Sequence, residues 1–234
     1  MKTRTLVFFV CSPAGRVGKS VVARLLGDYF LAGNRPFLGF DTDPHEPVFA
    51  ARFPQEAIVS DLGAVQGQMD LIDPLLINDD VPKIIDLWHR SMDAFFVLID
   101  QTEFFAEAAN AGIDPVLFYI ADSSTRTLDA ATRLADRYPD VQMVVVDNSG
   151  AAPVSREQLA RYPGRNLLKI GALDPVLRNA IDDPTFSLSR FMLAPPTGMS
   201  IVVRSGIRDW LVRIFAQLRS FELRMTLARA EHLG

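Results

Sequence analysis

The chain has 234 residues, of which 49% are hydrophobic and 22% are charged, and its formal net charge is −4. This composition supports one domain with a full hydrophobic core over residues 1–234, and the acidic balance argues against a protein that coats nucleic acid with its whole surface. No apolar run is long enough to span a bilayer, and no secretory signal opens the chain. The single cysteine, Cys11, excludes an internal disulfide. We therefore expect a cytoplasmic protein.

A phosphate-binding loop is expected near the start of the chain. Residues 16–20 read Arg-Val-Gly-Lys-Ser, after an apolar run at 6–10 and before a helical pattern. In such a loop the main-chain N–H groups hold phosphates, the lysine (Lys19) reaches the terminal phosphates, and the hydroxyl (Ser20) binds Mg²⁺. Pro13 stands where the usual pattern has glycine, but the order of strand, loop and helix supports the assignment. The expected nucleotide-binding residues are Gly15, Arg16, Val17, Gly18, Lys19, Ser20 and Val21.

Further down the chain, short apolar runs alternate with helical patterns. This alternation predicts a doubly wound, mostly parallel α/β sheet with helices on both faces. The expected strands after the first are 36–40, 95–99, 116–120, 141–146 and 167–170. The expected helices are 20–32, 81–92, 125–138, 155–161 and 175–181. Residues 44–80 have weak periodicity and several prolines, so we expect them to be the least regular and most mobile part.

Acidic residues follow two of the expected strands. Asp41-Thr42-Asp43-Pro44 ends the second strand, and Asp100 ends the strand expected at 95–99. In a parallel sheet these carboxylates lie at the same edge as the phosphate loop. We therefore predict that Asp43 orients the attacking water and that Asp41 and Asp100 hold magnesium together with Ser20. A turn or helix cap before Pro44, and a plain strand-ending role for Asp100, are the alternatives.

The phosphate loop, the Asp-x-Asp-Pro sequence and an aspartate after an apolar strand together resemble the ParA/MinD family of ATPases over about residues 4–185. The resemblance implies ATP and Mg²⁺ as cofactors, and a homodimer that forms around two ATP molecules and is reset by hydrolysis to ADP. It also implies a surface, such as DNA or a membrane, that is alternately bound and released. The Asp41-Thr42-Asp43-Pro44 variant is similar to small plasmid-encoded members, such as the TraL-like proteins of conjugative transfer regions.

One position departs from the family pattern. Where the family has a lysine that reaches the partner's phosphates, this chain has Ala14, and where the family has glycine it has Arg16. The loss of a cation from the developing phosphoryl charge predicts an ATPase that is slow or stimulated by a partner. We predict that Arg16 supplies the missing charge and is catalytic together with Lys19 and Asp43. An exposed loop arginine that faces solvent is the alternative.

Residues after the strand expected at 141–146 bear on the choice of base. The chain lacks the Asn-Lys-x-Asp signature of guanine binding, and Asp147-Asn148 stands where the resemblance implies an asparagine that contacts adenine. We therefore expect ATP rather than GTP, with Asn148 at the base. A turn residue before Ser149 is the alternative reading of Asn148.

The segment at 199–233 predicts an amphipathic, basic helix. Three uses remain open for it: a terminal helix that packs on the sheet, a basic surface for non-specific DNA or membrane contact, and a docking face for an unidentified protein. Trp88 is expected on a helix as a core or interface residue, and the three dispersed histidines do not predict a transition-metal site.

Three functions follow from these patterns. The first is a ParA/MinD-like switch in partition, positioning or conjugative transfer of plasmid DNA or of a secretion component. The second is an ATP-binding scaffold that does not hydrolyse ATP, which Ala14 suggests. The third is an ATP-dependent ligase similar to dethiobiotin synthetase, for which we find no substrate-binding insertion.

Overall fold

The computed structural model describes residues 4–164 and 166–231. Within them, seven parallel strands form one sheet in the order β3-β2-β4-β1-β5-β6-β7. The predicted α/β fold with a parallel sheet is therefore confirmed. The strands are β1 (Thr5–Cys11), β2 (Leu38–Asp41), β3 (Ala57–Val59), β4 (Lys83–Asp86), β5 (Ile113–Ile120), β6 (Gln142–Asn148) and β7 (Asn166–Ile170).

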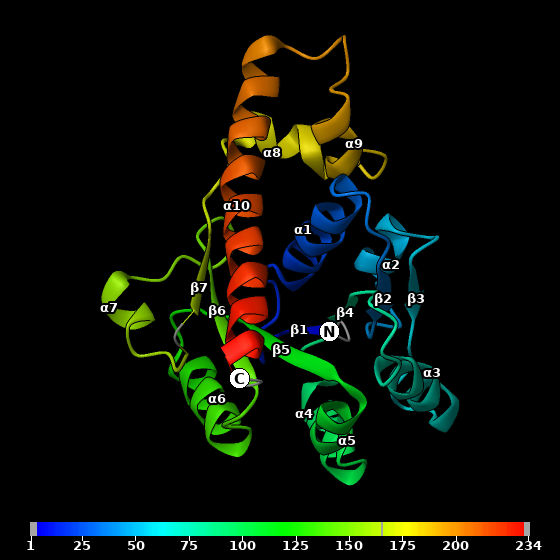
Figure 1. The fold of residues 1–234 in the computed structure, drawn as a ribbon. Helices are drawn as coiled ribbons and strands as arrows, with labels where there is room; N and C mark the ends of the chain where they lie inside the picture. Colours follow the sequence, from blue (N-terminus) through cyan, green and yellow to red (C-terminus); the bar gives the residue numbers. More distant parts are fainter. Residues whose placement is uncertain (1–3, 165, 232–234) are drawn as a thin grey trace.

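Helices cover both faces of the sheet (Figure 1). One face carries α1 (Lys19–Ala32), α2 (Val48–Arg52), α8 (Pro175–Asp182), α9 (Leu188–Leu193) and α10 (Ile201–Glu231). The other carries α3 (Val65–Leu75), α4 (Met92–Gln101), α5 (Phe104–Ala111), α6 (Thr125–Arg137) and the short α7 (Arg156–Leu159).

Strand β1 lies in the middle of the sheet and contributes to two separate cores. Leu6, Phe8 and Val10 pack among the residues of α1 and α10, while Phe9 and Cys11 pack among those of α4 and α5. Side chains of a strand point alternately to its two faces, so a strand buried on both faces is apolar throughout. This burial explains the unbroken apolar run that precedes the loop.

The third strand in chain order was predicted wrongly. Residues 95–99, expected as a strand, belong to α4, and residues 81–92, expected as a helix, contain β4. The buried apolar residues of α4 have helical spacing, at Met92, Phe95, Phe96 and Ile99. All four residues of β4 are buried instead. A short apolar run does not distinguish a buried strand from a buried helix. The strand was therefore predicted where α4 lies, and the helix where β4 lies.

Residues 44–80 are also more regular than expected, because they form α2, the edge strand β3 and α3. Helices α5 and α9 were not predicted, and α7 is shorter than the helix expected at 155–161, while the other elements follow the predictions to within a few residues. No helix among the described residues is both long and apolar enough to cross a membrane.

The basic segment at the end of the chain forms α10 up to Glu231, and residues 232 and 233 of the expected helix lie outside the described residues. Its buried residues are Ile207, Trp210, Leu211, Ile214, Leu218 and Phe221. Among the side chains of this helix that the structure describes, the exposed arginines are Arg208, Arg213, Arg219 and Arg224.

Candidate functional site

The expected phosphate loop connects β1 to α1 at the carboxyl edge of the sheet. Gly18 has φ +88°, and a Cβ added there would lie 2.2 Å from Nδ2 of Asn148, so only glycine fits this position. The same Nδ2 donates a hydrogen bond to the Val17 carbonyl (3.1 Å). Asn148, at the end of β6 and 3% exposed, therefore supports the loop from beneath. Its predicted contact with adenine stays a prediction.

Lys19 begins α1 and is buried, with 8% of its surface exposed. Its Nζ donates a hydrogen bond to the carbonyl of Ala14 (2.7 Å), so the ammonium group folds back over the loop. Burial lowers the pKa of Lys19, while the nearby carboxyl of Asp86 acts in the opposite direction. The hydrogen bond to Ala14 thus places the ammonium group of Lys19 at the loop, where it can meet an anion.

Asp86 is a site residue that the sequence analysis missed. It ends β4, next to β1, and lies directly opposite Asp41 in the register with β2. Burial raises the pKa of its carboxyl to about 7, and the nearby hydroxyl of Ser20 acts in the opposite direction. The short apolar run Ile84-Ile85 before an aspartate was the available signal, because β-branched pairs favour strands.

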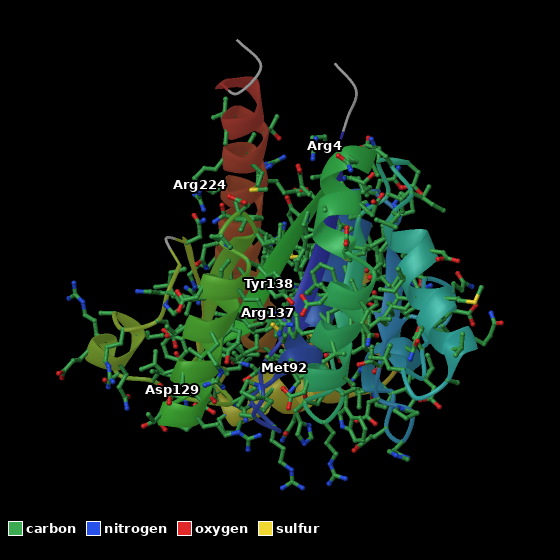
Figure 2. All side chains as sticks on the ribbon, turned by 90° about the horizontal axis from the view of Figure 1, so that it is seen from below. Arg4, Met92, Asp129, Arg137, Tyr138 and Arg224 are labelled. Atoms are coloured by element: carbon green, nitrogen blue, oxygen red, sulfur yellow. The ribbon has the colours of Figure 1, made fainter. Side chains whose placement is uncertain are left out.

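Asp100 does not belong to this site, which corrects its predicted role as a magnesium ligand. It lies near the end of α4, where the hydroxyl of Tyr138 donates a hydrogen bond to its carboxylate (2.7 Å) and Arg137 forms an ion pair with it. Crossover helices run opposite to parallel strands, so their carboxyl ends lie at the amino edge of the sheet. Figure 2 shows Tyr138 and Arg137 between Arg4, at one end of the molecule, and Met92.

The two acids after β2 have different surroundings. Both oxygens of Asp41 accept main-chain N–H groups, one from Asp43 (3.1 Å) and the other from Phe49 and Ala50 (2.9 and 3.2 Å) at the start of α2. Asp43 accepts two main-chain N–H groups through a single oxygen, Oδ1. Asp41 therefore binds main-chain N–H groups at the start of α2, and Asp43 makes the turn hydrogen bonds that were weighed as an alternative.

These residues surround one cavity of about 670 Å³. Its lining comes from the phosphate loop and from the segments that follow β2 and β4. The lining residues are Gly15, Arg16, Gly18, Lys19, Ser20, Val21, Asp41, Asp43, His45, Glu46, Val48, Asp86, Trp88, His89 and Arg90. The cavity therefore contains most of the expected loop residues and both acids after β2, while Val17, Asn148 and Asp100 are absent from its lining.

Arg16 is exposed at the cavity and has φ +60°, a left-handed conformation that favours glycine. An arginine in this conformation costs about 1 kcal/mol relative to glycine.

Trp88 and His89 were also misplaced by the sequence analysis, which put Trp88 on a helix. They follow β4, and their rings form an edge-to-face pair with centroids 5.8 Å apart. The main-chain N–H group of Trp88 donates a hydrogen bond to Oγ1 of Thr42 (2.8 Å). The hydroxyl of Thr42 is 3.2 Å from the Asp86 carbonyl and 3.3 Å from Oγ of Ser91. Thr42, which is 1% exposed, therefore joins the segments after β2 and β4.

No family model matches the chain, and no curated protein matches its sequence. Among solved structures, the chain is similar to a nucleotide-binding protein from Archaeoglobus fulgidus in complex with ADP, with a TM-score of 0.51 and 16% identity over 81% of this chain and 88% of that one. It also matches the MinC:MinD cell division protein complex of Aquifex aeolicus, with a TM-score of 0.44 and 12% identity over 92% and 96% of the two chains. The chain has the fold of a P-loop nucleotide-binding protein.

The arrangement also has the chemistry of a phosphate site. The loop offers main-chain N–H groups at the start of a helix, Lys19 offers a cation, and the Ser20 hydroxyl stands beside the Asp86 carboxyl. Mg²⁺ in nucleotide sites typically takes one or two protein oxygens together with phosphates and water. The described side chains include no group of three His, Cys, Asp or Glu residues that could hold a metal ion by themselves. The residues present therefore fit a metal that arrives with a nucleotide.

Proposed function

We propose that this protein binds ATP with Mg²⁺ and acts as a ParA/MinD-like, nucleotide-gated dimer switch. Its work would be the partition, positioning or conjugative transfer of plasmid DNA or of a secretion component. The observation that carries the proposal is the convergence of Lys19, Ser20 and Asp86 at one cavity beside a loop that needs glycine at position 18. The archaeal protein of the same fold was solved with ADP, which supports a nucleotide as the ligand.

The residues divide into three roles at the bound nucleotide. The loop amides and Lys19 hold the phosphates, while Ser20 and Asp86 hold the metal, which neutralises phosphate charge when bound. The carboxylate of Asp43, which lines the cavity, orients the attacking water. We assign Asp41 to holding the loop after β2, because its oxygens already accept three main-chain N–H groups.

Turnover is expected to be slow or to need a partner. Ala14 supplies no cation to the developing phosphoryl charge, and Arg16, exposed at the cavity, is the residue that can replace it within the subunit or across a dimer. An ATP-binding scaffold without hydrolysis is the second candidate, and Ala14 favours it. Single-site turnover above the rate of a Lys19→Ala variant would exclude the scaffold.

The four exposed arginines of α10 support contact with an anionic surface. Binding to duplex DNA that falls steeply between low and moderate salt would support DNA as that surface. Co-sedimentation with anionic lipid vesicles would support a membrane. If neither binds in the presence of Mg-ATP, α10 is a structural helix or a docking face for a protein.

The dimer switch is tested by light scattering in ADP, in Mg-ATP and in a non-hydrolysable analogue. We expect the molar mass to double with a triphosphate for the wild type and to stay at the monomer value for Lys19→Ala. Lys169→Ala is the matched control, because Lys169 is exposed on β7, outside the cavity lining. A monomer under all three conditions would refute the switch, and the scaffold would then be the better description.

A further inference from the structure

His89 lies over the phosphate loop. A Cβ added at Gly15 would be 3.4 Å from both Cε1 and Nε2 of His89, so the imidazole is in van der Waals range of the loop surface. The ring also lines the cavity and is partly exposed to it. None of the roles assigned above uses this side chain.

The position of His89 along the loop corresponds to the terminal phosphate. The lysine of a phosphate loop reaches the β- and γ-phosphates, and Nζ of Lys19 is bound to the carbonyl of Ala14 (2.7 Å). Ala14 directly precedes Gly15, over which His89 lies. The imidazole is therefore at the same end of the loop as the ammonium group.

The segment after β4 holds His89 in this place. The imidazole of His89 packs edge-to-face on the ring of Trp88. The main-chain N–H group of Trp88 donates a hydrogen bond to the buried hydroxyl of Thr42 (2.8 Å). Burial, together with the charge of Lys19, lowers the pKa of His89, which favours the neutral ring with its single N–H donor.

We propose that His89 donates a hydrogen bond to the terminal phosphate of a bound nucleoside triphosphate, and that this contact distinguishes the triphosphate from the diphosphate. The inference rests on the proposed nucleotide binding. It adds a contact within the subunit at the phosphate end of a loop that lacks the family's lysine. Thr42 acts as a positioning residue, because it fixes the main chain next to His89.

The test compares the dissociation constants of Mg-ADP and of a non-hydrolysable ATP analogue by titration calorimetry. His89→Phe keeps a ring against Trp88 but removes the donor. We expect it to weaken the binding of the analogue about tenfold and to leave ADP binding unchanged, because a hydrogen bond to a charged group contributes on this scale. Thr42→Val should reduce the same preference, and Thr42→Ser should restore it.

His45→Phe is the matched control. His45 is exposed, lines the same cavity and packs against Trp88 from the segment after β2 (ring centroids 5.5 Å apart), but the three atoms nearest to a Cβ added at Gly15 all belong to His89. We expect the preference for the analogue to survive this change. His89→Gln, which keeps an N–H donor, should retain more of the preference than His89→Phe and gives a second measurement if the phenylalanine variant does not fold.

The outcomes separate the two proposals. If the wild type binds neither nucleotide, nucleotide binding itself is refuted. If the wild type binds both and His89→Phe, or His89→Gln where the phenylalanine variant does not fold, leaves both constants unchanged, then binding stands and the role of His89 is refuted.

Discussion

The hydroxyl of Ser20 stands beside the buried carboxyl of Asp86 at the boundary between α1 and β4. Ser20 follows the loop lysine, and Asp86 ends the strand that pairs with β1. The pair thus connects the phosphate loop to the neighbouring strand. Mg²⁺ that arrives with a nucleotide would take oxygen ligands of these two kinds, a hydroxyl and a carboxylate.

Substitutions of Asp86 and of Asp100 should have different effects on ATP binding. Asp86→Asn is expected to lower the Mg²⁺-dependent affinity for ATP at least tenfold, because it removes a charged oxygen beside Ser20. Asp100→Asn is the matched control: its partner Arg137 is 48% exposed, so its loss should cost less than about 1 kcal/mol of stability and leave ATP binding unchanged. Calorimetric titration of both variants checks this, and equal losses would return Asp100 to the site.

The nucleotide-free protein should lose stability as the pH rises toward 7. The folded-state pKa of Asp86 is raised from 3.8 to about 7, so the folded state binds more protons than the unfolded state between these values. The free energy of unfolding therefore falls over this pH range. Asp86→Asn should remove this trend and stabilise the nucleotide-free protein at pH 8 by roughly 1–2 kcal/mol. Urea denaturation at pH 5 and at pH 8 measures the effect, and a parallel pH dependence in both proteins would contradict it.

Arg16→Gly should raise stability while it removes a cation. Glycine relieves the positive φ of +60°, so we expect a gain of about 1 kcal/mol in the free energy of unfolding. Asn34→Gly is the control, since Asn34 has φ +54° but asparagine tolerates this conformation better. Light scattering of Arg16→Gly in Mg-ATP tests whether the cation of Arg16 contributes to dimerisation. Unchanged dimerisation and turnover in a more stable protein would exclude Arg16 from the mechanism.

Asn148→Ala should destabilise the loop even without nucleotide. The Val17 carbonyl loses its side-chain donor, which predicts a decrease of about 1 kcal/mol in the free energy of unfolding. If Asn148 also contacts adenine, the preference for ATP over GTP falls in the same variant. Melting curves and binding of both nucleotides separate the two roles: lower stability with unchanged base preference would leave Asn148 as a support of the loop alone.

Local patterns in the sequence were enough to predict the phosphate loop, the parallel α/β fold and the position of the acids after β2. These features depend on local order, since an apolar strand, a glycine-containing turn and a helix start follow one another directly in the chain. The burial of α10 along Ile207, Trp210 and Leu211 was likewise visible as helical spacing.

Which aspartate lies at the loop depends on tertiary contacts. Asp86 and Asp100 both follow short apolar runs, and local pattern could not tell a four-residue strand from one face of a helix. The pairing of β4 with β1 resolves the choice, because it depends on contacts between residues far apart in the chain. The same pairing brings His89 over Gly15, and the pairing of β6 with β5 brings Asn148 under Val17; no spacing in the sequence records either contact.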